Sequence, residues 1–135
     1  MAYTHTTTVR VRYSETDRMG YVYYGAYAAY LEVGRVETLR ALGVSYKALE
    51  DEGVMLPVGT LHLDYKQPAT YDDEVHIQTT ITSLPSARID FDYLLTLGDG
   101  TVLATGYTQL VFVDDASRRP MRPPLKVLEA LKRYF

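Results

Sequence analysis

Residues 24–42, YGAYAAYLEVGRVETLRAL, place apolar side chains on nearly every face of a helix and carry only four charges. Tyr27, Leu31 and Gly34 follow one another at steps of three or four, which is the period of an α-helix. A helix that is apolar nearly all round belongs in the middle of a domain. Gly43 suits its C-terminal end. We therefore predict a buried, long central helix from about Tyr24 to Leu42.

Alternating runs on both sides of this helix predict strands. The first run, Thr6–Tyr13, places Val9, Val11 and Tyr13 on one side. Four further runs, which lie after the central helix, cover residues 61–65, 75–81, 89–97 and 102–113. The connectors between the last three are short enough for antiparallel hairpins. Five antiparallel strands are therefore expected.

The order of the elements predicts an α+β fold. Ser45 caps a short predicted helix to about Glu52, and a last helix runs from Leu125 to about Tyr134. A curved antiparallel sheet covers an apolar face most simply by wrapping around the central helix. Gly106 is a predicted bulge in the last strand. We expect one domain over residues 1–135, with a C-terminal tail from about residue 114.

Composition excludes several classes of protein. The 135 residues are 47% hydrophobic and 23% charged, with a net charge of −3, so disorder and a general nucleic-acid surface are disfavoured. Without cysteine there is no disulfide scaffold, thiolate metal site or cysteine nucleophile. No two of the three histidines have helical metal-site spacing, and we predict no metal or other cofactor. No signal peptide or membrane-spanning run is evident, which favours the cytoplasm.

Common catalytic and nucleotide-binding motifs are absent. The sequence contains no G-x-S-x-G nucleophile turn and no glycine-rich phosphate loop. One segment, residues 13–32, instead places Asp17 in a polar loop that leads directly into the central helix. A helix N-terminus offers unpaired N–H groups that can hold an oxyanion, beside a carboxylate that can act as base or nucleophile. An Asp that only caps a turn or a helix is the alternative reading.

Three segments carry a resemblance to a known family. Residues 11–35, 63–74 and 88–93 resemble hotdog-fold acyl-CoA thioesterases of the 4-hydroxybenzoyl-CoA thioesterase family, which includes YbgC-like proteins. The resemblance covers about residues 8 to 113. It implies a hotdog fold, in which the curved five-stranded sheet wraps the central helix. It also implies an acyl-CoA substrate and a homodimer that assembles into a homotetramer. The net charge of −3 separately argues against a nucleic-acid or membrane partner.

The resemblance assigns roles to individual residues. Asp17 corresponds to the catalytic carboxylate, as general base or nucleophile, and the backbone N–H groups near Tyr24 and Gly25 correspond to the oxyanion site. Candidate substrate-binding residues are the aromatic residues Tyr23, Tyr27 and Tyr30 and the basic residues Lys66 and Arg88. We read Glu32 as structural, paired with Arg35 one helical turn later.

Two departures from the family keep other functions open. Tyr24 and Ala26 stand where many YbgC-like members have His and Asn. The alternative is a hotdog protein that binds acyl thioesters without hydrolysing them. A dehydratase acting on acyl-carrier-protein thioesters is a further alternative, but that chemistry relies on a pocket His, which the matching segment lacks.

Overall fold

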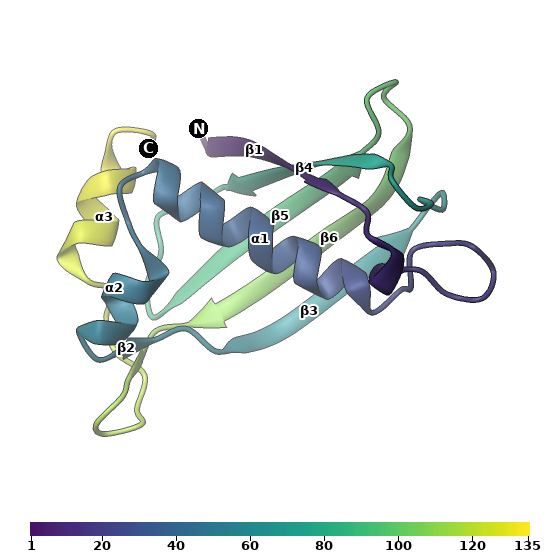
Figure 1. The fold of residues 1–135 in the computed structure, drawn as a ribbon. Helices are drawn as coiled ribbons and strands as arrows, with labels where there is room; N and C mark the ends of the chain where they lie inside the picture. The colour runs from purple at the N-terminus through teal and green to yellow at the C-terminus, as the bar shows by residue number, and fades with distance from the viewer.

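A five-stranded antiparallel sheet and one helix across its face dominate the structure (Figure 1). The computed structural model describes residues 1–135. The strand order is β1-β4-β5-β6-β3, and α1 (Ala26–Ala41) lies on one face of the sheet. The strands are β1 (Tyr3–Arg10), β3 (Val58–Tyr65), β4 (Glu74–Ile81), β5 (Arg88–Thr96) and β6 (Val102–Val111). The predicted α+β class and the predicted five-stranded antiparallel sheet are confirmed.

The helix and the strands follow their sequence periods, with shifted ends. The helix α1 has 16 residues, which is not far above the average helix length, so it is central rather than unusually long. The first strand begins and ends three residues before the predicted bounds. Tyr13 lies outside it in a single 3-10 turn, Tyr13–Glu15, where its exposed ring stacks on Tyr71 with centroids 4.1 Å apart. The prediction that Tyr13 continues the first strand, on the same side as Val9 and Val11, was therefore wrong.

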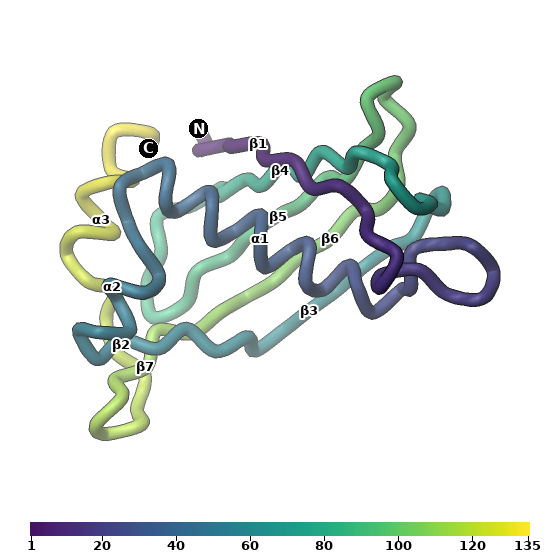
Figure 2. Tube along the Cα trace, viewed as in Figure 1, coloured from purple at the N-terminus to yellow at the C-terminus, as the bar shows by residue number.

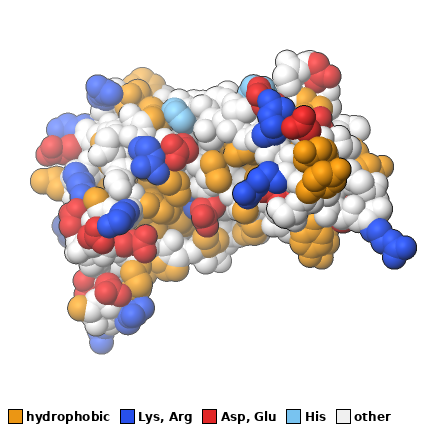
Figure 3. Space-filling model, in the orientation of Figure 1, with side chains coloured by type: hydrophobic (Ala, Val, Ile, Leu, Met, Phe, Trp, Pro, Cys, Tyr) orange, Lys and Arg blue, Asp and Glu red, His pale blue; other side chains and the backbone are white.

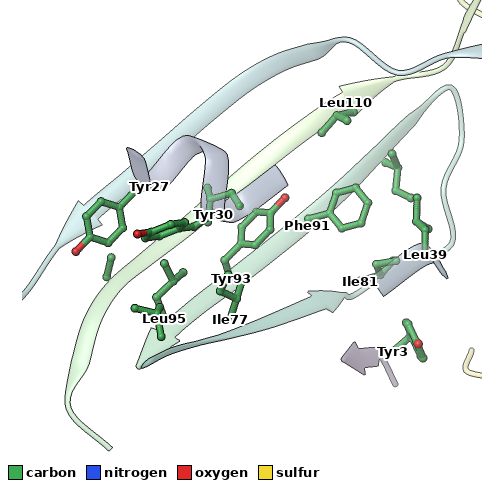
Figure 4. Close-up of a cluster of buried hydrophobic side chains, with 14 of the residues drawn as sticks. Tyr3, Tyr27, Tyr30, Leu39, Ile77, Ile81, Phe91, Tyr93, Leu95 and Leu110 are labelled. Atoms are coloured by element: carbon green, nitrogen blue, oxygen red, sulfur yellow. The ribbon is translucent and has the colours of Figure 1, made fainter. Parts of the chain in front are cut away.

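The core lies between α1 and the inward face of the sheet. Burial alternates residue by residue along β4 and β5, as expected for strands with one covered face. Figure 4 shows Tyr93 of β5 beside Tyr30, Phe91 beyond Tyr93 on the same strand, and Leu39 near Ile81. Aromatic residues fill much of this layer because the helix brings Tyr27 and Tyr30 onto the strands.

Gly34 is the point of closest approach between α1 and the sheet. A Cβ atom built there would lie 2.7 Å from the Ile77 Cγ2 atom and 2.7 Å from the Thr79 Oγ1 atom. Real Cβ atoms do not approach other atoms so closely, so only glycine fits without a shift of the helix or of both side chains. Gly34 thus allows the helix to pack closely on the sheet because it has no side chain.

Gly106 has a different role from the predicted one. It pairs in register with Leu63 on one side and with Tyr93 on the other, so it does not form a bulge. The register shifts lie instead between Val58 and Thr60 and between Leu95 and Thr96. A Cβ atom at Gly106 would meet the Leu31 side chain at 3.2 Å, so the glycine makes room for the helix.

Small elements cover one end of the sheet, and a loop projects from the other (Figure 2). The helix α2 (Tyr46–Asp51) begins at Ser45, whose hydroxyl accepts from the Ala48 N–H, as predicted. The same end carries α3 (Leu125–Lys132) and an unpredicted two-stranded sheet of β2 (Val54–Met55) and β7 (Val113–Asp114). None of the three helices has the length and hydropathy needed to cross a lipid bilayer.

Candidate active site

Asp17 lies in the loop between β1 and α1, at the end of the sheet away from α2 and α3. Its Oδ1 atom accepts hydrogen bonds from the Met19 N–H at 3.0 Å and the Tyr21 N–H at 3.3 Å. Its backbone pairs with Tyr21, and Gly20 turns the chain at a φ of +83°. Asp17 therefore does hold a turn. That role occupies one carboxylate oxygen and leaves Oδ2 without a hydrogen-bond partner in the chain.

A cavity of about 270 Å³ opens beside this carboxylate. Asp17, Tyr24, Tyr27, Tyr65 and Lys66 line it together with Tyr21, so the chain brings together a carboxylate, four phenol rings and an ammonium group. Its remaining lining residues are Met19, Val22, Gln67 and Pro68. The mainly apolar and aromatic wall with a few polar groups is typical of a small-molecule site.

The turn before α1 carries two free hydrogen-bond donors, one on Tyr24, which lines this cavity, and one on the next residue, Gly25. The N–H groups of Tyr24 and Gly25 donate to no atom of the chain, whereas those of Ala26 and Tyr27 are bonded to carbonyls of the preceding turn. The Tyr65 hydroxyl donates to the Tyr24 carbonyl at 2.8 Å and so ties this turn to β3. Free N–H groups at a helix N-terminus can stabilise a negatively charged oxygen.

Glu15 anchors the same loop by hydrogen bonds to residues on both sides of it in the sequence. Its carboxylate accepts from the Tyr30 hydroxyl at 2.8 Å and from the Arg12 N–H at 2.9 Å, and its carbonyl accepts from the Tyr23 N–H. Burial alone would raise the pKa of Glu15, but the hydrogen bonds from Arg12 and Tyr30 and the Arg12 charge outweigh it and lower that pKa. Tyr30 is thus a support of the loop, while Tyr27 reaches the cavity.

We expect Glu15→Gln to destabilise the protein by about 1–2 kcal/mol at neutral pH, because the hydrogen bonds to a carboxylate are lost. A lowered pKa in the folded state stabilises the protein above the ordinary value of 4.5. This stabilisation disappears as the pH falls through the lower folded pKa. The difference between wild type and variant in urea denaturation should therefore shrink on acidification. Glu129→Gln, at an exposed carboxylate of α3, is the control. A pH-independent difference would show that Glu15 is not held as a carboxylate.

The remaining candidates lie at different distances from the cavity. The Tyr23 ring packs over Gly25, where a Cβ atom would meet it at 2.5 Å, but neither residue lines the cavity wall. Arg88 begins β5 at the opposite end of the sheet, where it pairs with Val111. Glu32 forms no ion pair with Arg35, although both line a second cavity. The sequence did not predict Tyr65 as a site residue. Its place at the end of an alternating run indicates only a strand position and gives no sign that the side chain reaches the cavity.

The face of the molecule that carries α1 is partly apolar (Figure 3). Hydrophobic side chains gather along the helix and around the loop at its N-terminal end, and charged side chains lie at both ends of this face. Five tyrosines fall between Tyr21 and Tyr30, and Tyr21, Tyr23 and Tyr24 are exposed. The rim of the cavity is therefore aromatic and carries no histidine.

Comparison with known proteins gives a consistent result. Residues 11–131 match the model of the thioesterase-like superfamily. The chain is 34% identical to the acyl-CoA thioester hydrolase YbgC of Escherichia coli over 124 residues, 92% of each chain. It is 31% identical to the acyl-CoA thioesterase YbgC of Haemophilus influenzae over 123 residues, 90% of each chain. A crystal structure of a DHNA-CoA thioesterase from Staphylococcus aureus superposes with a TM-score of 0.85 at 32% identity and covers 98% of this chain and 83% of that one. The fold is accordingly the hotdog fold that the sequence resemblance implies.

Proposed function

We propose, since the chain belongs to the thioesterase-like superfamily, that it hydrolyses acyl-CoA thioesters at the Asp17 cavity. One observation carries this assignment. The same loop presents a carboxylate oxygen of Asp17 that accepts no hydrogen bond and, at the start of α1, two N–H groups that donate none. Thioester hydrolysis needs both: a base or nucleophile for the attack, and donors for the oxygen that becomes negative. Tyr24 and Gly25 provide the donors.

The proposed reaction uses Asp17 through its free Oδ2 atom. In the general-base route, Oδ2 takes a proton from water, the hydroxide attacks the thioester carbonyl, and the N–H groups of Tyr24 and Gly25 hold the oxyanion. The carbon–sulfur bond then breaks, and the CoA thiolate leaves and is protonated. In the nucleophilic route, Oδ2 itself attacks the carbonyl, the carbon–sulfur bond breaks and the CoA thiolate leaves and is protonated. Water then hydrolyses the resulting anhydride to the free acid and the Asp17 carboxylate. The Oδ1 atom stays bonded to Met19 and Tyr21 in both routes and keeps the carboxylate in place.

Neighbouring residues are proposed to bind the two parts of the substrate. Tyr27 and Tyr65 form an aromatic wall with rings 5.1 Å apart, edge to face, which suits an acyl group. Lys66 lines the same cavity and can bind a phosphate of coenzyme A. Tyr23 is proposed at the entrance. Arg88 begins at the other end of the sheet, so a role for it at the phosphates requires a second copy of the chain. No metal or other cofactor takes part in the proposed reaction.

We propose that two copies pair through the β3 edge. β3 is hydrogen-bonded to β6 alone, and its apolar side chains Val58, Leu61 and Tyr65 are nearly half exposed. An open, apolar strand edge is a ready site for pairing with another strand. The further association of dimers into a homotetramer rests on the family resemblance. A cytoplasmic location is proposed from the sequence alone, which shows no signal peptide or membrane-spanning run. Light scattering after gel filtration tests the assembly: a mass of 15.3 kDa in solution would overturn it.

Thiol release from a panel of aromatic and aliphatic acyl-CoAs tests the activity directly. A thiol-reactive dye suits this chain, since it has no cysteine to add background. We expect turnover on at least one class of acyl group, and the class that is hydrolysed fastest would identify the type of substrate. Binding of acyl-CoA without thiol release would favour the alternative, a protein that binds acyl thioesters without hydrolysing them. That alternative is motivated by Tyr24 and Ala26, which stand where many family members have His and Asn.

A further inference from the structure

The largest cavity in the chain lies away from Asp17. It has a volume of about 560 Å³, within the range of small-molecule sites. The second half of α1, the helix α2 and the segment 54–57 form its walls, and it shares no residue with the Asp17 cavity. Its apolar lining consists of Val36, Leu49, Val54, Met55, Leu56 and Pro57.

Arg35 gives this cavity a buried positive charge. The residue is only 8% exposed, it takes part in no ion pair, and its buried Nε–H has no hydrogen-bond acceptor. The guanidinium lies beside the Tyr46 and Tyr93 hydroxyls but has no carboxylate partner, and a buried charge without a counter-charge is costly because the water that would solvate it has been removed. Glu32 lies one turn earlier on the same helix, but its exposed carboxylate does not reach Arg35 in an ion pair. An acceptor from outside the chain would remove this cost.

Tyr46 supplies a second unused donor to the same cavity. Its hydroxyl is buried and has no hydrogen-bond partner. Burial raises the pKa of Tyr46 to about 12, although the neighbouring Arg35 charge opposes the rise, so the phenol stays protonated and can donate. The nearby Tyr93 hydroxyl is already bonded to the Thr108 hydroxyl at 2.6 Å. The Arg35 Nε–H and the Tyr46 hydroxyl are therefore the buried donors of this cavity that have no acceptor.

We propose that this cavity binds an organic monocarboxylate, with the carboxylate on Arg35 and Tyr46 and the apolar body against α1 and α2. A planar carboxylate matches the fork of a guanidinium and can accept from the phenol as well. The exposed carboxylates of Glu32 and Glu50 stand at the mouth of the cavity, and Arg118 is paired with Asp115 at 3.4 Å. Repulsion from the two glutamates disfavours phosphates and other multiply charged anions. The inference does not depend on the proposed hydrolysis.

Calorimetric titration tests this site with benzoate and hexanoate as probes, against the neutral analogues benzamide and hexanamide. We expect the carboxylates to bind and the amides not to bind. Tyr46→Phe should weaken carboxylate binding about tenfold, and Arg35→Met about 100-fold, because a charged hydrogen-bond partner is lost. Arg40→Met, at an exposed position of the same helix, should change nothing. Equal binding of benzoate and benzamide, or benzoate binding unaffected by Arg35→Met, would overturn the proposal.

Two further measurements, of thermal stability and of oligomeric state, distinguish a ligand-binding role of Arg35 and Tyr46 from a structural one. Tyr46→Phe removes a buried hydroxyl that has no partner, so the unliganded variant should melt no lower than the wild type. If Arg35→Met does not fold, Tyr46→Phe alone decides the question. If Arg35→Met folds but loses the dimer in light scattering, the partner of Arg35 is a carboxylate of a second copy, and the ligand proposal is wrong. Activity at Asp17 is not the readout in any of these measurements.

Discussion

Asp17→Asn lowers kcat/KM for acyl-CoA hydrolysis by about 100-fold or more, the usual contribution of a general base. The substitution separates the two roles of this residue. The amide oxygen can still accept the hydrogen bonds from Met19 and Tyr21, so the turn is kept. The group that replaces Oδ2 is an NH2, which can neither take a proton from water nor attack a carbonyl. The loss is therefore expected in the chemical step, without a loss of folding.

A second aspartate provides the matched control for this experiment. Asp99 holds the β5–β6 hairpin by accepting from the Thr101 N–H at 2.9 Å, which is the same local role without a cavity. Asp99→Asn should leave kcat/KM unchanged. Thiol release is measured for wild type and both variants, with circular dichroism to confirm folding. Equal turnover in Asp17→Asn and wild type would mean that Asp17 only holds the turn.

Phe91→Ala is expected to lower the free energy of unfolding by about 3–5 kcal/mol. Phe91 lies on the central strand β5, is completely buried, and faces α1 beside Tyr93 (Figure 4). Removing the ring takes away its contacts and leaves a cavity that neighbouring strands, fixed by hydrogen bonds on both sides, cannot close. Since a domain of this size is stable by only about 5–15 kcal/mol, a large part of the total is at risk.

Urea denaturation of Phe91→Ala and Phe91→Leu measures this effect. The leucine variant keeps most of the buried volume and should lose clearly less stability than the alanine variant. Equal losses in the two variants would show that the space around residue 91 relaxes freely. That result would contradict the close packing of α1 against the sheet.

The sequence periods predicted the fold well because each buried face repeats at a fixed step. Alternation in 75–81 and 89–97 marked β4 and β5 nearly to the residue. It failed where a side chain is placed by the tertiary structure. Tyr13 continues the alternation of the first strand, yet the chain has already left the sheet and the ring stacks on Tyr71. The two-residue strands β2 and β7 are too short for any period to reveal.

The candidate site was predictable in part, by resemblance rather than by pattern. Asp17 and Tyr24 are close in sequence, and the loop between them is a local structure. Tyr65 and Lys66 reach the same cavity only because β3 runs antiparallel to β6 and ends beside the start of α1. Arg35 illustrates the opposite case: helical spacing predicted a pair with Glu32, whereas the packed helix turns Arg35 inward and leaves Glu32 exposed.

The close approach at Gly34 should make the residues allowed at three positions of the chain depend on one another. The helix rests on Ile77 and Thr79 of β4 at that residue, with no space for a methyl group. A relative with alanine or a larger residue at position 34 should therefore carry a smaller side chain at 77 or 79, or a helix displaced from the sheet. Displacement would also move the N-terminal turn that holds Tyr24 and Gly25. Covariation among positions 34, 77 and 79 in a family alignment would thus record how lineages kept the turn in place while the core changed.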